Sequence, residues 1–177
     1  FNSVTARTAG FNITDFSGYG FATVMLVCLL MFIGGSPGGT AGGIKTTTFA
    51  ISLGELWRLV RGHDSLHFHN RRVARDVVER STAMIVLSVL WVSLSVVLVS
   101  LGNPEADPPD VIFECFSAFG TVGLSRSFTM ELSPFSKTVI IASMFAGRVG
   151  LLTLVFTLAG QATPRRYELP DARLPLN

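Results

Sequence analysis

Long stretches without charged residues dominate the chain, and their lengths predict helices that cross a membrane. Residues 16–44 and 81–101 contain no charged side chain, and residues 138–159 contain only Arg148. About 20 helical residues cross the hydrocarbon core of a bilayer, so each stretch is long enough to span it. Residues 81–101 are rich in Leu, Val and Ser without a Gly or Pro, which predicts an unbroken helix.

A fourth apolar segment, residues 111–125, is too short to span a bilayer. Its only charged residue is Glu114. It includes the sequence Gly120-Thr121-Val122-Gly123. This length and these glycines predict a half-helix that enters the membrane and returns as extended backbone.

The charged residues between these segments predict an orientation. Six arginines lie in residues 55–80 and three in the C-terminal tail: Arg58, Arg61, Arg71, Arg72, Arg75, Arg80, Arg165, Arg166 and Arg173. The linker at residues 102–110 contains acidic residues but no Lys or Arg. Because positive loops stay in the cytoplasm, the arginine-rich loop and the tail are expected inside and the linker outside. The half-helix then enters from the outer face.

Composition supports a membrane protein over a soluble one. Hydrophobic residues make up 49% of the 177 positions and charged residues 15%, against about 25% charged in soluble domains. The net charge of +2 gives no indication of nucleic-acid binding, and the two cysteines lack metal-binding or redox spacing. Phe1 is not an initiator methionine and no signal-peptide pattern follows it, so we expect a piece of a longer protein.

An internal repeat relates the two ends of the chain. A shift of 113 residues places Thr8 on Thr121 and Gly10 on Gly123, and it places the sequence MFIG on MFAG. Each copy therefore has a short glycine loop at the same distance ahead of an apolar helix, which predicts a repeated helix, re-entrant loop and helix. The first copy is expected to be truncated at its start.

The two glycine loops resemble sites that bind dehydrated cations. Thr121-Val122-Gly123 matches the start of the TVGYG loop whose backbone carbonyls replace the hydration shell of K⁺, and Thr8-Ala9-Gly10 is its counterpart. Glycine allows positive φ, which lets carbonyls of successive residues point the same way. A half-helix before the loop would also direct its negative C-terminal end at the cation.

These motifs together resemble the Ktr/Trk/HKT superfamily of potassium transporters, and KtrB-type subunits in particular. The matching sequences are SVTARTAGFN, MFIGGSPGGTAGGIKTTTF, FECFSAFGTVGLS and MFAGRVG. The resemblance implies an all-α membrane protein of helix–pore loop–helix repeats with a broken transmembrane helix. Four such repeats surround one pore in this superfamily. The chain would then hold the end of the third repeat in residues 1–60, a cytoplasmic loop in 61–80, the fourth repeat in 81–161 and a cytoplasmic tail in 162–177.

The resemblance also implies the transported ion, the site and the partners. It implies a multi-pass subunit of the bacterial plasma membrane that transports K⁺, with Na⁺ as a candidate coupling ion, without a cofactor or enzymatic activity. It further implies a homodimer on a cytosolic ring of nucleotide-binding regulatory subunits. Asn12 and Ser125 stand where TVGYG has its second glycine, so the filter should be shorter than a channel's. The implied filter residues are Thr8, Ala9, Gly10, Phe11, Thr121, Val122, Gly123 and Leu124.

A glycine-rich segment interrupts the first apolar stretch. Six glycines and one proline occur within ten residues, a composition that cannot remain helical. The resemblance implies an intramembrane gate at Gly34, Gly35, Ser36, Pro37, Gly38, Gly39, Thr40, Ala41, Gly42 and Gly43, with Lys45 and Arg148 beside it. A plain hinge between two helices is the alternative. A nucleotide-binding P-loop is a further alternative, although Ile44 separates Gly43 from Lys45 and disturbs the P-loop spacing.

The remaining candidates each have two interpretations. Lys45 either faces the ion pathway or extends to the inner interface, and Arg148 is either an electrostatic barrier or half of a buried ion pair. His63, Asp64, His67 and His69 form either a metal site or an ordinary solvated loop. The arginine-rich loop and the Arg165–Arg166 tail are candidates for contact with a cytosolic partner or with anionic lipid. The competing function classes are a transporter subunit, a P-loop enzyme and a membrane scaffold.

Overall fold

Helices make up nearly all regular structure in the computed structural model, which describes residues 1–39, 41–62, 67–68 and 71–159. In chain order these are α1 Asn2–Thr5, the 3-10 helix η1 Phe16–Gly18, α2 Phe21–Phe32, α3 Thr46–Arg61, α4 Arg75–Gly102, α5 Pro108–Gly120, the 3-10 helix η2 Phe128–Glu131, α6 Pro134–Val149 and α7 Leu151–Ala159. A two-residue hairpin between α3 and α4 pairs β1 His67–Phe68 with antiparallel β2 Arg71–Arg72. The expected all-α class is confirmed, with this hairpin as a small addition.

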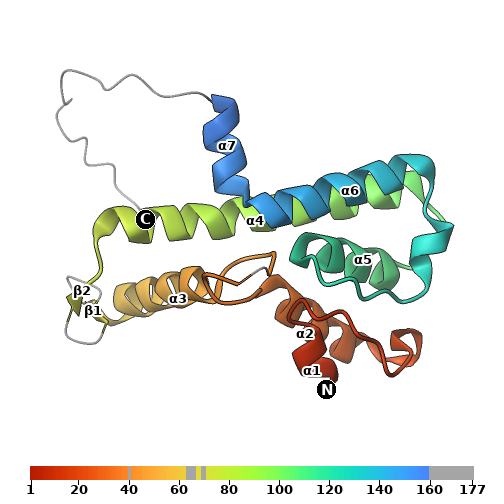
Figure 1. Cartoon of the computed structure of the whole chain (residues 1–177), viewed down its shortest axis with the longest axis horizontal. Coiled ribbons are helices and arrows are strands. Elements are labelled where there is room, and N and C mark those ends of the chain that lie inside the picture. The colour runs from red at the N-terminus through yellow and green to blue at the C-terminus, as the bar shows by residue number, and fades with distance from the viewer. Residues whose placement is uncertain (40, 63–66, 69–70, 160–177) are drawn as a thin grey trace.

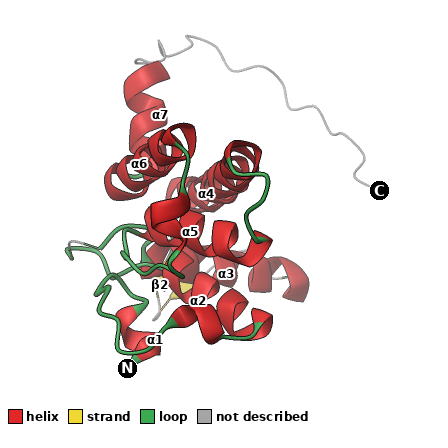
Figure 2. Ribbon diagram, turned by 90° about the vertical axis from the view of Figure 1, so that its right-hand side faces the viewer, coloured by secondary structure: helices red, strands yellow, loops and turns green. Residues whose placement is uncertain are grey.

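The helices are arranged around α5. Helices α4 and α6 run side by side along the longest axis, and α3 lies beside one end of α4 (Figure 1). Helix α5 contacts α4 and α6 on one side and α2 on the other, so it occupies the centre of the bundle (Figure 2). Eight residues of α5 are buried, among them Phe113 and Phe119. The short predicted half-helix is therefore the central element of the core, and it begins at Pro108, earlier than the sequence pattern suggested.

Helix α4 confirms the predicted unbroken helix over residues 81–101. Within the part of the chain that the structure describes, it alone is both long and apolar enough to cross a membrane. Its buried positions recur at heptad spacing and are small: Val78, Ser81, Ser88, Val92, Ser95 and Val99. Its exposed positions include large apolar side chains such as Leu90, Leu94 and Leu101. Small residues inside and large apolar residues outside are typical of helices that pack within a bilayer.

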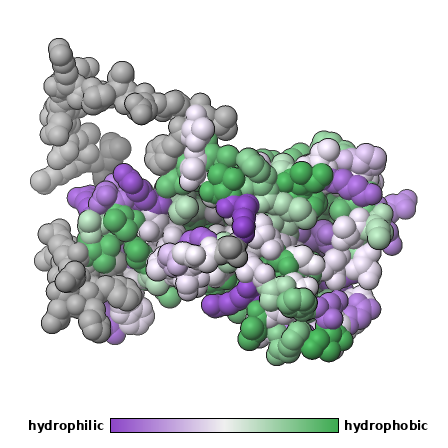
Figure 3. Space-filling view, in the orientation of Figure 1, coloured by the Kyte–Doolittle hydropathy of each residue, from purple (hydrophilic) through white to green (hydrophobic). Residues whose placement is uncertain are grey.

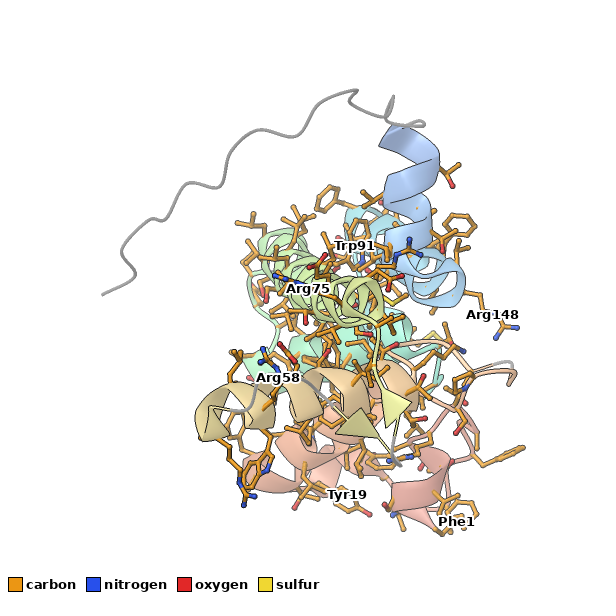
Figure 4. The ribbon with its side chains drawn as sticks, turned by 90° about the vertical axis from the view of Figure 1, so that its left-hand side faces the viewer. Phe1, Tyr19, Arg58, Arg75, Trp91 and Arg148 are labelled. Carbon is orange, nitrogen blue, oxygen red and sulfur yellow. The ribbon has the colours of Figure 1, made fainter. Side chains whose placement is uncertain are left out.

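Serine hydroxyls join α4 to α6 along this small-residue face. Ser95 and Ser143 lie 2.9 Å apart between their Oγ atoms, and the Trp91 indole N–H donates to Ser143 Oγ at 3.3 Å. Figure 4 shows Trp91 between the two helices. Ser95 and Ser143 also bond to the carbonyls of Trp91 and Val139 one turn earlier, so their hydroxyls are satisfied without water. Such interhelical bonds are worth about 0.6 kcal/mol each in membranes.

Residues 138–159 do not form a single spanning helix, so that expectation was wrong, whereas the helix within residues 16–44 ends before the glycine-rich segment that was expected to be non-helical. Residues 138–159 divide at Gly150, whose φ of 89° and ψ of 124° lie outside the helical region, so α7 turns away from α6 (Figure 1). Residues 16–44 contain the 12-residue α2, which ends at Phe32 before the glycine-rich segment. Glycine provides the backbone conformation that ends α6, whereas α2 ends where Ile33 adopts an extended conformation.

Exposed apolar surface extends well beyond α4. Large hydrophobic side chains of α2 and α6, including Leu26, Leu29, Ile141 and Phe145, are more than half exposed. Figure 3 shows hydrophobic residues over large parts of one face of the molecule. Large apolar side chains that are exposed on several helices suit these faces to contact with lipid or further protein.

Candidate functional site

The two glycine loops adopt the same unusual backbone conformation. Thr8 and Gly10 have φ values of 65° and 70°, and Thr121 and Gly123 have values of 51° and 87°. The residue between them in each loop does not have a positive φ. A β-branched residue in the left-handed region is a true outlier, and such strain is concentrated at functional sites. This alternation of left-handed and ordinary φ values differs from a regular strand, in which all φ values are negative.

The end of α5 explains how this conformation arises. The amide of Thr121 donates to the carbonyl of Ala118 at 3.0 Å, and the amide of Val122 donates to that of Ser117 at 3.0 Å. This is the Schellman arrangement that ends many helices, with threonine at the left-handed position where glycine is usual. In the first loop, the amides of Ala9 and Gly10 both donate to the carbonyl of Thr5, at 3.2 and 3.1 Å.

In these capping bonds the loop amides donate to carbonyls that precede the loop, and the loop carbonyls themselves remain without a donor. Among the described residues, no donor bonds to the carbonyl oxygens of residues 8–10 or 121–123. Hydroxyl and amide donors bond instead to neighbouring atoms, such as the carbonyl of Phe11, which accepts from Thr5 Oγ1 at 2.7 Å. Partly enclosed carbonyls without donors are suited to coordinate a cation.

The two loops also touch each other. A Cβ atom built on Gly10 would collide with the carbonyl oxygen of Val122. Only glycine permits this approach, so the loops lie side by side although 112 residues of sequence separate these two positions. The structure thus brings Gly10 of the first loop against Val122 and Gly123 of the second.

Polar side chains form hydrogen bonds to the segment that follows each loop. Glu114, buried on α5, accepts from Ser125 Oγ at 2.9 Å and from Thr129 Oγ1 at 2.6 Å. In the first copy, the side-chain Nδ2 of Asn2 donates to Thr14 Oγ1 at 2.9 Å and to the Tyr19 hydroxyl at 2.7 Å. In both copies a side chain near the preceding helix holds the segment that follows the loop, which restricts movement of the carbonyls.

The glycine-rich segment folds into a closed loop between α2 and α3. Ile33 and Ile44 form a parallel bridge at its base, where the amide of Gly34 donates to the carbonyl of Ile44 at 2.8 Å. The amide of Ile44 in turn donates to the carbonyl of Phe32 at 3.2 Å. These bonds hold the two ends together, so the segment projects as one unit rather than as an extended hinge.

This loop is bonded to the base of the second filter-like segment and to α6. The amide of Gly42 donates to Thr121 Oγ1 at 3.1 Å, and the amide of Gly43 donates to the carbonyl of Gly147 at 3.1 Å. Gly147 itself lies so close to the carbonyl of Phe119 that a Cβ atom there would collide with it. The end of α5, the glycine-rich loop and α6 therefore meet next to Thr121.

The two predicted basic residues differ in their surroundings. The Lys45 ammonium donates to the carbonyl of Ala41 at 2.5 Å, so it holds the loop rather than extending away from it. Arg148 is exposed and has no hydrogen bond or ion pair within the part of the chain that the structure describes. Figure 4 shows it pointing away from the helices.

One residue of this region was missed by the sequence analysis. Arg126 lies three positions after Gly123 and binds across to the segment that follows the first loop. Its signal in the sequence was a single arginine directly after a filter-like motif, in a region otherwise expected on the outer face.

Several other predicted residues lie outside the described part of the chain. These are Thr40, His63, Asp64, His69, Arg165, Arg166, Arg173 and the tail from residue 162 onward. Among the residues that are described, no group of three or more His, Cys, Asp or Glu could hold a metal ion. Cys28 and Cys115 are free and buried. The P-loop alternative also lacks its structural context, because a helix, α2, precedes the glycine-rich segment where a P-loop follows a strand.

Comparison with known proteins identifies the family. The model of the TrkH family, described as cation transport protein, matches residues 1–164. The chain belongs to this family. It is 40% identical over 159 residues to the Ktr system potassium uptake protein B of Bacillus subtilis (strain 168), covering 90% of this chain and 36% of the relative. It is 38% identical over 181 residues to the potassium/sodium uptake protein NtpJ of Enterococcus hirae, covering 99% of this chain and 40% of the relative.

A third relative gives the same picture. The Ktr system potassium uptake protein B of Vibrio alginolyticus is 38% identical over 171 residues, which cover 97% of this chain and 37% of that protein. The chain thus spans less than half the length of these relatives. The sequence-based recognition of the family is confirmed, and a membrane cation transport family agrees with the apolar faces of α2, α4 and α6.

Proposed function

We propose that the chain forms part of the ion pathway of a potassium uptake protein in the bacterial plasma membrane, with several membrane passes. The observation that supports this most is the pair of adjacent loops with matching positive φ, in which the carbonyls of residues 8–10 and 121–123 accept no hydrogen bond from the described residues. The family match and the uptake proteins among its relatives support the same function. The filter would be formed by Thr8, Ala9, Gly10, Phe11, Thr121, Val122, Gly123 and Leu124.

The proposal includes a repeat of helix, pore loop and helix. The shift of 113 residues that relates the two loops also relates Phe21, the first residue of α2, to Pro134, the first residue of α6. It places η1 over η2 within one residue as well. Sequence identities and element boundaries at one common shift support a duplicated unit.

The glycine-rich loop would act as a gate. Because this loop interrupts a spanning segment, the segment would be a broken transmembrane helix. Single neutral hydrogen bonds connect the amides of the loop to Thr121 Oγ1, at the base of the proposed filter, and to the Gly147 carbonyl of α6. Each such bond contributes about 0.5–1.5 kcal/mol, which is small enough for the loop to leave and return. Arg148, exposed next to Gly147, would add a positive charge beside this gate.

The ion and the partners complete the proposal. K⁺ would be the transported ion, and Na⁺ the coupling ion, as the name of the Enterococcus relative includes both. The full-length protein would form a homodimer and bind a cytosolic ring of nucleotide-binding regulatory subunits. A transporter needs no enzymatic cofactor for this function.

The test is potassium uptake by the full-length parent protein in cells that lack their own uptake systems. Gly123→Ser would force a side chain into a left-handed conformation at about 1–2 kcal/mol, so we expect the apparent K⁺ affinity to fall about tenfold. Gly20→Ser is the matched control, since Gly20 has a negative φ and open space at Cβ. Wild-type affinity in Gly123→Ser would exclude the filter, and a parent protein that folds without carrying K⁺ would favour a scaffold.

A further inference from the structure

Arg126 makes an unusual set of contacts at the exit of the second filter-like segment. Its side chain is only 11% exposed. Nε donates to Asp110 Oδ1 at 2.5 Å, on the first turn of α5. Nη1 donates to the carbonyl of Phe16 at 2.6 Å and, more weakly, to that of Tyr19 at 3.4 Å, while Nη2 donates to the carbonyl of Ser17 at 3.2 Å.

These partners belong to two different filter-bearing units. Asp110 lies at the start of the helix that leads into the second loop, whereas η1 follows the first loop. Phe16 is fully buried, and its ring contacts Phe113 of α5 with 5.6 Å between centroids. One guanidinium therefore binds both units at the level where their chains leave the filter, 110 residues apart in sequence.

We propose that Arg126 is a positioning residue that clamps the two filter segments together at the outer mouth and thereby sets the separation of their carbonyls. This inference rests on the proposed function of the two loops. Discrimination between K⁺ and Na⁺ depends on the geometry and number of coordinating carbonyls, so a looser mouth should discriminate less.

The guanidinium fork suits this position better than an ammonium group would. Arginine presents five N–H donors in a rigid plane, and here one group binds a carboxylate and the carbonyls of three residues at once. A lysine keeps the charge but cannot reach the same set of acceptors in fixed directions. Arg126→Lys therefore keeps the positive charge but loses the set of contacts that form the clamp.

The positive charge of Arg126 is offset by nearby carboxylates, so it need not repel entering cations. Asp110 forms a direct ion pair with it. Hydrogen bonds from Ser17 and, more weakly, the charge of Arg126 hold the pKa of Asp15 below its usual value, so that carboxylate stays ionised at neutral pH. Lys137, in the first turn of α6, has no ion pair among the described residues.

The experiment compares ion selectivity of the full-length protein, reconstituted in liposomes, for Arg126→Lys, Arg126→Gln and the control Lys137→Gln. Lys137→Gln removes a positive charge near the same end of the bundle without disturbing the clamp. We expect the K⁺-over-Na⁺ preference to fall about tenfold in both Arg126 variants, which corresponds to 1.4 kcal/mol. The maximal K⁺ rate per folded molecule should remain close to wild type, as should every property of the control.

A merely structural role would lower the yield or the melting temperature of the Arg126 variants and leave the ion preference unchanged, which would overturn the clamp. An equal loss in Lys137→Gln would overturn it too, because charge alone would then explain the effect. If neither Arg126 variant folds, Asp110→Asn weakens the clamp and keeps the carbonyl contacts, and unchanged selectivity there overturns the proposal. Wild-type protein that carries no K⁺ would instead refute the proposed function itself.

Discussion

The hydrogen bond between Gly42 and Thr121 gives the sharpest test of the gate. Thr121 takes part in both proposed devices, because its carbonyl belongs to the filter and its Oγ1 accepts from the loop amide at 3.1 Å. Thr121→Val removes the hydroxyl and keeps a β-branched side chain of nearly the same shape. The loop amide then loses its acceptor, whereas the backbone of the filter keeps its capping bonds to Ser117 and Ala118.

The size of the effect follows from the strength of one neutral hydrogen bond. Such a bond contributes about 0.5–1.5 kcal/mol, which is about 2-fold to 13-fold in an equilibrium at 25 °C. If the loop blocks the pathway when bonded to Thr121, the variant should raise K⁺ flux per molecule by about fivefold at the middle of that range. Selectivity should stay nearly unchanged, because the proposed coordinating groups are backbone carbonyls, which this substitution keeps.

The assay is rubidium flux into liposomes at fixed protein density, with Thr121→Ser as the control that keeps the hydroxyl. Gly42→Ala provides an independent perturbation of the same contact, since its Cβ would meet Thr121 Cγ2 at 2.7 Å and displace the loop. The double variant should gain little beyond either single one, because both act on one contact. Unchanged flux in well-folded Thr121→Val, or an equal rise in Thr121→Ser, would refute the gate.

Two further predictions concern α6. Arg148→Ala should raise the maximal uptake rate and leave the melting temperature unchanged, because Arg148 is exposed and has no ion pair among the described residues. A lower melting temperature without a gain in flux would show a buried ion pair instead. Gly147→Ala should lower the melting temperature and the yield, at about 1–3 kcal/mol of overpacking, since its Cβ would collide with the rigid Phe119 carbonyl. A normally stable Gly147→Ala protein in a thermal-shift assay would contradict the observed helix contact.

Local patterns in the sequence predicted several elements well. An uninterrupted apolar stretch predicted α4, and the density of glycine predicted a non-helical segment that the structure places between Phe32 and Thr46. The two glycine loops were found because their residue types, and the distance to the following helix, are repeated. These features depend on neighbours in sequence, for which propensity and spacing are sufficient.

Other expectations failed or were absent because they depend on contacts between distant residues. Nothing in residues 138–159 shows that Gly150 would end α6, since a single glycine is tolerated in many helices. The sequence assigned no partner to Glu114, whereas the structure shows that it accepts hydrogen bonds from Ser125 and Thr129. Arg126 received no role at all, although its sequence position next to the filter was visible.

The sequence by itself determined the class of protein, the position of the long apolar helix α4, the two threonine–glycine loops and the family. Only the tertiary structure showed that Gly10 touches Val122, that the loop amide of Gly42 bonds to Thr121 across 79 residues, and that Arg126 reaches Phe16 across 110. The physical reason is that composition and periodicity encode which surface a segment buries. Which distant partner it meets is decided by the close approach of backbones at glycine and by the few donors left to satisfy free carbonyls.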